Sequence, residues 1–95
     1  MRTLLSPADV SGQIAKLPGW SVDGAQIRKA FSFKNFSAAI GFINAVAVCA
    51  EKADHHPDML LHVWNKVDVM LSTHSAKGIT MMDFNLAAAI EGLGL

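Results

Sequence analysis

The chain has 95 residues, the size of one small domain, and hydrophobic residues make up 52% of it. Eight Lys and Arg balance eight Asp and Glu, so the formal net charge is zero. Without a basic surplus, the sequence does not favour binding to nucleic-acid phosphates or to a membrane surface. We therefore expect one globular domain over residues 1–95, with no direct binding to nucleic acid and no association with a membrane.

The N-terminal segment predicts a helix followed by a β-hairpin. Ser6 is the expected N-cap of the helix, Pro7 suits its first position, and Pro18-Gly19 ends it. The hairpin covers residues 20–33 and turns at Asp23-Gly24, a dipeptide typical of tight β-turns. One face of its second strand carries the apolar side chains of Ile27, Phe31 and Phe33.

The longest predicted helix covers NFSAAIGFINAVAVCAEKAD, residues 35–54, with Ser37 as its expected N-cap. Between Ala38 and Ala50 its only polar side chain is Asn44, whereas a helix with one solvent-exposed face should carry a broader polar stripe. We therefore expect both sides of this helix to be covered, one by the sheet of its own chain and the other by a partner subunit.

Cys49 is the only cysteine, and it lies in the apolar run AVAVCA of this helix. It cannot form a disulfide within the chain, and we expect a buried structural thiol that suits a reducing compartment. The sequence MRTLLSPADV reaches a Ser-Pro pair too early for the apolar region of a signal peptide, and no uninterrupted apolar stretch has membrane-spanning length. The expected location is the cytoplasm.

A second hairpin is predicted in LLHVWNKVDVMLSTH, residues 60–74, with its turn near Asn65-Lys66. Its second strand alternates between two sets of side chains, and His74 continues the second set if the strand persists that far. The first set is apolar and consists of Val67, Val69 and Leu71, and the second begins with Asp68, Met70 and Ser72.

The C-terminal segment predicts a linker and then a helix, at whose start Thr80 and Asp83 have the spacing of a capping box. The predicted element order is α-β-β-α-β-β-α. Helices combined with hairpins indicate an α+β fold, in which three helices pack on one face of a small four-stranded antiparallel sheet. The apolar face of the last helix consists of Met82, Leu86, Ala89, Ile90 and Leu93.

Two adjacent histidines in DHHPD, residues 54–58, leave three interpretations open. A zinc site would draw on His62 and His74, but the spacing matches neither an HExxH pair nor a Cys/His finger. The segment could also be a solvated loop without a chemical role. Pro57 restrains His56 to an extended conformation, as in an ordinary polar connection between two elements. An acid–base site would use imidazoles, which change protonation near neutral pH, and it needs at least two of them at one pocket.

A fixed spacing links these histidines to residues before and after them: Glu51, His55, His56, Pro57, Trp64, His74 and Asp83. This pattern, together with the segments NKVDVMLSTH and DFNLAAAIE, resembles the pterin-4a-carbinolamine dehydratases. Many members of that family have a Trp shortly after His-His-Pro-Glu, where this chain has Met59 and Leu60. The gap from the proline to Trp64 is also the longer of the two variants in the family.

The resemblance implies a dehydratase that converts 4a-hydroxytetrahydropterin to quinonoid dihydropterin and water. That substrate is the product left by an aromatic amino acid hydroxylase, so the reaction would serve tetrahydropterin recycling. The resemblance implies catalytic roles for three histidines: His55 and His74 are expected to transfer protons, and His56 is expected to bind or orient the pterin. The chemistry requires no redox cofactor and no metal.

Four further residues are expected to contact or support the pterin substrate. Glu51 could orient an imidazole, or be a solvated residue at a helix end. Trp64 could stack on the pterin plane, or pack in the core. Asp83 could bind the amide edge of the pterin, orient a histidine, or serve only as a capping residue. Pro57 completes the set.

Family members form homodimers or homotetramers, so the expected macromolecular partner is a second copy of the chain. The alternative function is a non-catalytic protein-binding module, either a dimerisation partner of a homeodomain transcription factor or an assembly factor. In that case the apolar helix would matter most. Because a binding module has no need of the complete set of His55, His56 and His74, we favour the enzyme.

Overall fold

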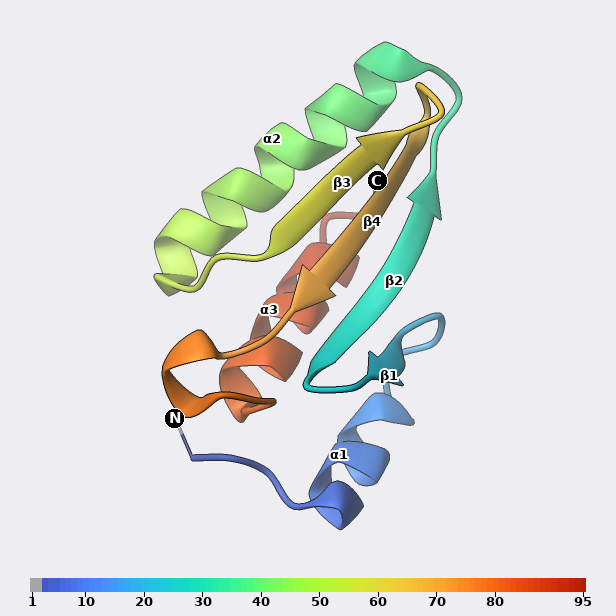
Figure 1. Cartoon of the computed structure of the whole chain (residues 1–95). Helices are drawn as coiled ribbons and strands as arrows, with labels where there is room; N and C mark the ends of the chain where they lie inside the picture. The colour runs from blue at the N-terminus through green and yellow to red at the C-terminus, as the bar shows by residue number, and fades with distance from the viewer. Residues whose placement is uncertain (1–2) are drawn as a thin grey trace.

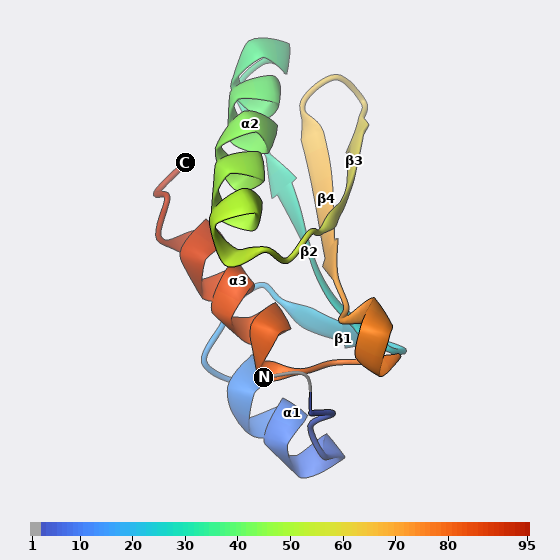
Figure 2. The ribbon, with the colours of Figure 1, turned by 90° about the vertical axis from the view of Figure 1, so that its left-hand side faces the viewer.

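The computed structural model of the chain describes residues 3–95 and confirms the predicted α+β fold and element order (Figure 1). The strands form one antiparallel sheet in the order β1-β2-β4-β3. The helices lie on one side of this sheet, with α2 and α3 across it and α1 near β1 (Figure 2). The elements are α1 (Pro7–Ile14), β1 (Ser21–Asp23), β2 (Gln26–Ser32), α2 (Phe36–Ala53), β3 (Asp58–His62), β4 (Lys66–Leu71), the 3-10 helix η1 (His74–Ala76) and α3 (Met81–Glu91).

The core forms between the inner face of the sheet and the helices α2 and α3. Alternate residues of a strand face the same side, so β2 and β4 each give a row of apolar side chains to the core. Phe42 of α2 packs against the rings of Phe31 and Phe33, with centroid separations of 4.6 and 4.9 Å. The other buried members include Ile27, Val46, Val67, Val69, Leu71, Phe84, Leu86 and Ile90.

The predicted N-cap of α2 is wrong, because the helix begins two residues earlier than expected. The side chain of Asn35 accepts a hydrogen bond from the backbone N–H of Ala38 at 2.8 Å, and Ser37 already lies inside the helix. Asn35 has the extended backbone, with φ −160° and ψ 176°, that an N-cap requires. Since Asn and Ser cap about equally well, residue type alone could not choose between them.

The second hairpin also differs from the prediction at both ends of β4. Its turn lies at residues 63–65 rather than at Asn65-Lys66, and Val63 and Trp64 both have positive φ. The side-chain N–H of Asn65 donates a hydrogen bond to the backbone carbonyl of Phe33, and the backbone carbonyl of Asn65 accepts one from the N–H of Phe33, each at 2.9 Å. These two hydrogen bonds fix the register of the hairpin. β4 ends at Leu71, so His74 does not continue the strand and instead begins η1.

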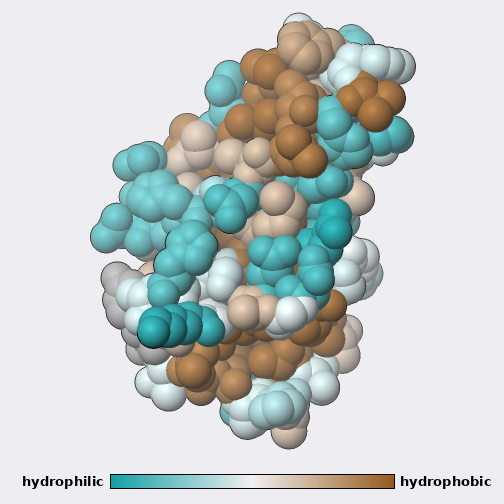
Figure 3. All heavy atoms as spheres, viewed as in Figure 1, coloured by the Kyte–Doolittle hydropathy of each residue, from teal (hydrophilic) through white to brown (hydrophobic). Residues whose placement is uncertain are grey.

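The outer face of α2 is apolar and uncovered in the single chain. Its inner side chains, among them Phe42, Val46 and Ala50, pack in the core. Val48 is 70% exposed, and Phe36 and Ile40 are also exposed. Figure 3 shows further hydrophobic surface at the end of the molecule that holds the start of α2 and the β3–β4 turn. Within residues 3–95, α2 is the one helix long and apolar enough for a membrane span, but its packed inner face is that of a core helix.

Cys49 lies on the flank of α2 and is half-buried against the core, rather than fully buried as the apolar run predicted. α2 has a closely packed face and an open face, and the thiol sits between them. A side chain in an apolar run of a helix is therefore not buried by composition alone, because its angle around the helix axis decides its surroundings.

We expect Asn35→Ala to lower the free energy of unfolding by about 0.5–2 kcal/mol, because it removes the side-chain acceptor at the start of α2. Ser37→Ala is the matched control and should change it by less than about 0.5 kcal/mol. Urea denaturation of the two variants measures both values. A larger loss for Ser37→Ala than for Asn35→Ala would contradict the observed helix start.

Candidate active site

Two segments that follow α2 and β4 line a cavity of about 210 Å³ that is open to solvent. The first contains His55 and His56, and the second contains His74, so the structure brings the three predicted histidines to one cavity. This volume lies below the range of about 300–1,000 Å³ that is usual for small-molecule pockets, so it suits a compact ligand. The lining residues are Asp54, His55, His56, Ser72, Thr73, His74 and Ser75.

The end of α2 explains why the adjacent histidines point in different directions. Asp54 is the C-cap and has a left-handed backbone, with φ 50° and ψ 44°. Its N–H and that of His55 still bond the last carbonyls of the helix, which ends the helix in a tight turn. The chain then continues extended through Pro57, so His55 is only 8% exposed whereas the side chain of His56 is 59% exposed.

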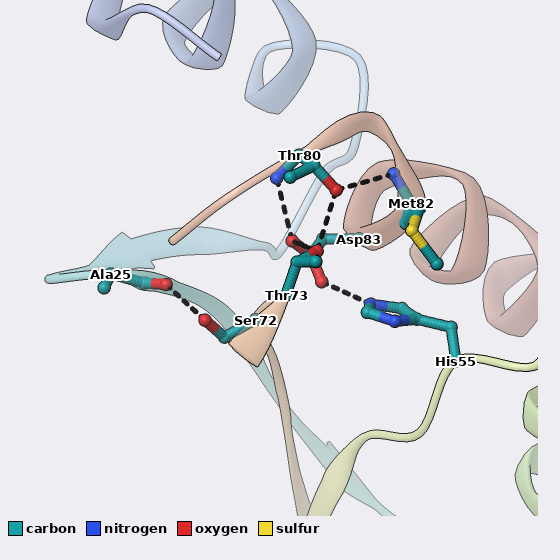
Figure 4. Close-up of polar contacts among 7 residues, drawn as sticks. All are labelled: Ala25, His55, Ser72, Thr73, Thr80, Met82 and Asp83. Atoms are coloured by element: carbon teal, nitrogen blue, oxygen red, sulfur yellow. Dashed lines mark hydrogen bonds and ion pairs between the residues drawn. The ribbon is translucent and has the colours of Figure 1, made fainter. Parts of the chain in front are cut away.

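A fully buried carboxylate holds His55 in place (Figure 4). Asp83, in the first turn of α3, is 0% exposed, and its Oδ1 lies 2.6 Å from Nε2 of His55. Its Oδ2 accepts hydrogen bonds from the backbone N–H of Thr80 and from the hydroxyl of Thr73, each at 2.9 Å. The capping box predicted from Thr80 and Asp83 is therefore present, and the same carboxylate contacts the imidazole.

These contacts determine which nitrogen of His55 carries a hydrogen. Asp83 accepts two hydrogen bonds at Oδ2, as an ionised carboxylate does, and an ionised carboxylate has no hydrogen to donate. In the contact with His55 the donor is therefore Nε2. In the neutral imidazole, Nδ1 is then the nitrogen with a free lone pair. No hydrogen bond to Nδ1 is found within residues 3–95. His55 can therefore accept a proton at Nδ1.

The second histidine of the pair has a different environment. Nε2 of His56 lies 3.3 Å from Oε1 of Glu51, and both side chains are largely exposed. Glu51 thus contacts His56 and does not contact His55, although it lies one helical turn before the latter. His74 is exposed at the start of η1, where Thr73 pairs with Gly78 and closes the loop. Solvent reaches His56 and His74, whereas it barely reaches His55.

None of the four residues predicted to bind the substrate lines this cavity, and Glu51 contacts it only through His56. Trp64 is 58% exposed in the β3–β4 turn. Trp64 is separated from the segment of His74 by the six residues of β4, which span about 20 Å. Trp64 is not packed in the core either. Asp83 is sealed behind His55, so its side chain faces the imidazole and the capping contacts. Pro57 is half-buried and directs the chain from His56 into β3.

Sequence reasoning missed several polar residues that line the cavity: Asp54, Ser72, Thr73 and Ser75. The signal available was the run STHS, in which hydroxyl residues flank His74. His55 also borders a second, more apolar cavity of about 270 Å³ between the end of α2 and α3. Among residues 3–95, no three His, Cys, Asp or Glu side chains are placed to hold a metal ion.

Comparisons with known proteins agree on one family. The family profile described as pterin 4 alpha carbinolamine dehydratase matches residues 3–93. A predicted pterin-4-alpha-carbinolamine dehydratase of Thermosynechococcus vestitus is 44% identical over 95 residues, which cover 100% of this chain and 99% of the relative. A second one, from a Cyanothece strain, is 46% identical over 93 residues, covering 98% of this chain and 95% of the relative.

Two solved structures resemble the fold. A transcriptional coactivator/pterin dehydratase from Brucella melitensis has a TM-score of 0.89 and 39% identity, with 96% of this chain and 98% of that chain covered. A pterin dehydratase-like protein identified as a RuBisCO assembly factor in the alpha-carboxysome has a TM-score of 0.63, with 78% of this chain and 84% of that chain covered. Its identity is 19%, so this second likeness concerns the fold alone.

We expect Asp83→Ala to lower the free energy of unfolding by about 2–5 kcal/mol, because it leaves buried donors of Thr73, Thr80 and His55 without their acceptor. Glu51→Ala is the matched control. It also removes a carboxylate paired with a histidine, but the Glu51 side chain is 79% exposed, so the change should stay within about 0.5 kcal/mol. Urea denaturation measures both, and similar losses for the two variants would contradict this account of Asp83.

Proposed function

Because the chain belongs to the pterin-4a-carbinolamine dehydratase family, we propose that it catalyses the dehydration of a 4a-hydroxytetrahydropterin to quinonoid dihydropterin. The observation that carries the proposal is the meeting of His55, His56 and His74 at one cavity, although His74 lies far along the chain from the other two. Groups that give and take protons on a compact planar substrate need this convergence.

The reaction removes water across two neighbouring atoms of the pterin. The C4a–O bond breaks and the hydroxyl leaves as water after it gains a proton. N5 loses its hydrogen, and the electron pair of that N–H bond forms the new N5=C4a double bond. One proton is thus donated and one is accepted in each turnover. A positioned acid and a positioned base each contribute on the order of 10²–10⁴-fold to such a step.

We assign the base to His55 and the acid to His74. His55 has a lone pair at Nδ1, and the Asp83 carboxylate at Nε2 stabilises the imidazolium that forms when Nδ1 takes the N5 proton. His74 is exposed at the cavity and donates a proton to the leaving hydroxyl. Protons exchanged with solvent then restore both residues. No redox cofactor or metal ion enters these steps.

His56 is proposed to bind and orient the pterin, with Glu51 supporting its imidazole at 3.3 Å. Pro57 holds His56 extended at the rim of the cavity. Trp64 lies at the far end of β4, so we leave it out of the contacts that a pterin makes within this chain. We place the reaction in the cytoplasm, after a hydroxylase that produces the carbinolamine and before a reductase that supplies the two electrons needed to return quinonoid dihydropterin to tetrahydropterin.

We expect His55→Ala and His74→Ala each to lower kcat/KM for carbinolamine dehydration on the order of 10²–10⁴-fold, because each removes one proton-transfer group. Absorbance stopped-flow of a freshly generated 4a-hydroxytetrahydropterin follows the reaction. His62→Ala is the control, since His62 pairs with Asp68 on the sheet and lies outside the cavity. Wild-type rates in both cavity variants would remove the proposed mechanism.

A second proposal concerns assembly. We infer that the outer face of α2 is covered by further copies of the chain in a homodimer or homotetramer, because an exposed apolar helix face is unfavourable in water. The same face would serve a non-catalytic protein-binding module. The similar protein from Brucella melitensis is named both as a transcriptional coactivator and as a pterin dehydratase, which is the observation that favours this second candidate function.

We expect the wild-type chain to sediment as a dimer or tetramer at micromolar concentration, and Val48→Glu to shift it to a smaller species by placing a charge in the apolar contact. Val22→Glu is the control, since it adds the same charge at an exposed apolar residue of β1. A monomeric wild type would refute the proposed assembly. An oligomer without dehydratase activity would favour the protein-binding module.

A further inference from the structure

The hydroxyl of Thr73 is a buried polar group that the proposed proton transfers do not use. Thr73 follows β4, is 1% exposed, and has its Oγ1 2.9 Å from Oδ2 of Asp83. The same oxygen lies 2.7 Å from Oγ1 of Thr80, which is also buried. Figure 4 shows Thr73 and Thr80 in contact at the Asp83 carboxylate, which also contacts His55. Thr73 therefore contacts the carboxylate that holds His55 and does not itself contact the imidazole.

The hydrogen bonds in this cluster have one consistent direction. A hydroxyl has a single hydrogen to donate, and that of Thr73 goes to Asp83. In the contact between the two threonines, Thr80 must then be the donor. Its oxygen accepts from the backbone N–H of Met82 at 3.1 Å. The chain of donors thus runs from Met82 through Thr80 and Thr73 to Asp83.

The direction of these hydrogen bonds determines which donor each oxygen of the Asp83 carboxylate faces. The Thr73 hydroxyl and the Thr80 N–H both donate to Oδ2, while Oδ1 faces Nε2 of His55 alone. Because these groups are almost completely buried, water does not replace a missing donor. We propose that Thr73 is a positioning residue, which acts through Asp83 to keep the hydrogen of His55 on Nε2 and leave Nδ1 as the proton acceptor.

The kinetic consequence of this inference rests on the proposed dehydratase function, but the tautomer of His55 does not. A purely structural role for Thr73 would require only its shape and its contribution to stability. Thr73→Val keeps the shape and removes the hydroxyl, whereas Thr73→Ser keeps the hydroxyl and removes the methyl group. The two substitutions therefore separate positioning from packing.

The first measurement is the tautomer of His55 in ¹⁵N-histidine-labelled protein, read from the ¹⁵N shifts and long-range ¹H couplings of its ring. The His55 signals are those that His55→Gln removes. We expect the Nε2–H tautomer in the wild type and in Thr73→Ser, and a mixture with the Nδ1–H tautomer in Thr73→Val. Ser72→Ala is the control for this signal, because the neighbouring Ser72 hydroxyl bonds the Ala25 carbonyl and not Asp83 (Figure 4).

The second measurement is dehydration kinetics. We expect Thr73→Val to lower kcat on the order of 10–100-fold, as for the loss of one hydrogen bond to a charged group, with KM within about threefold of wild type. Thr73→Ser should restore kcat to within about threefold. If Thr73→Val does not fold, Thr73→Cys gives a graded test, because a thiol is a weak donor and should give an intermediate kcat.

Three results would overturn the inference. The first is an unchanged tautomer together with an unchanged kcat in Thr73→Val or Thr73→Cys. The second is an equal loss of kcat in Thr73→Val and Thr73→Ser, which would assign the effect to packing. The third is an Nδ1–H tautomer in the wild type. A wild type that shows the Nε2–H tautomer but no dehydration would contradict the proposed function and leave the positioning by Thr73 supported.

Discussion

The buried carboxylate of Asp83 is the group on which the candidate site depends. It joins three segments that are distant in the chain: the start of α3, the residue Thr73 after β4, and the residue His55 after α2. A carboxylate removed from water is unfavourable unless hydrogen-bond donors surround it, and here each of the three segments supplies one. The position of the His55 imidazole is therefore fixed by its hydrogen bond to this carboxylate.

The division of the site into a buried part and an exposed part follows from that constraint. His55 is held behind the cavity with one nitrogen bound and the other open, whereas His56 and His74 lie where solvent and a ligand can reach them. In the proposed dehydration, His55 would be the base with a fixed tautomer and His74 the acid in exchange with water, so that two protons move in one turnover. The sheet and helices contribute rigidity, because the site residues flank their ends.

The exposed apolar surfaces lie away from the cavity. The exposed apolar residues of α2 lie on its outer face, and those of the β3–β4 turn lie at the opposite end of β4 from the cavity. Val63 and Trp64 adopt left-handed backbone conformations there, which are unfavourable for a β-branched residue and persist only where surrounding contacts impose them. The hydrogen bonds between Asn65 and Phe33 supply those contacts.

Period-2 alternation in β4, the turn signal Asp23-Gly24 and the apolar length of α2 determined the fold class and element order from sequence alone, because each depends on contacts between near neighbours. The same is true of the Thr80–Asp83 capping box. Sequence could not show that Asp83 faces His55, that Glu51 faces His56, or that Trp64 lies away from the cavity. Those pairings join residues from different elements, and only the packing of α2, β4 and α3 decides which side chains meet.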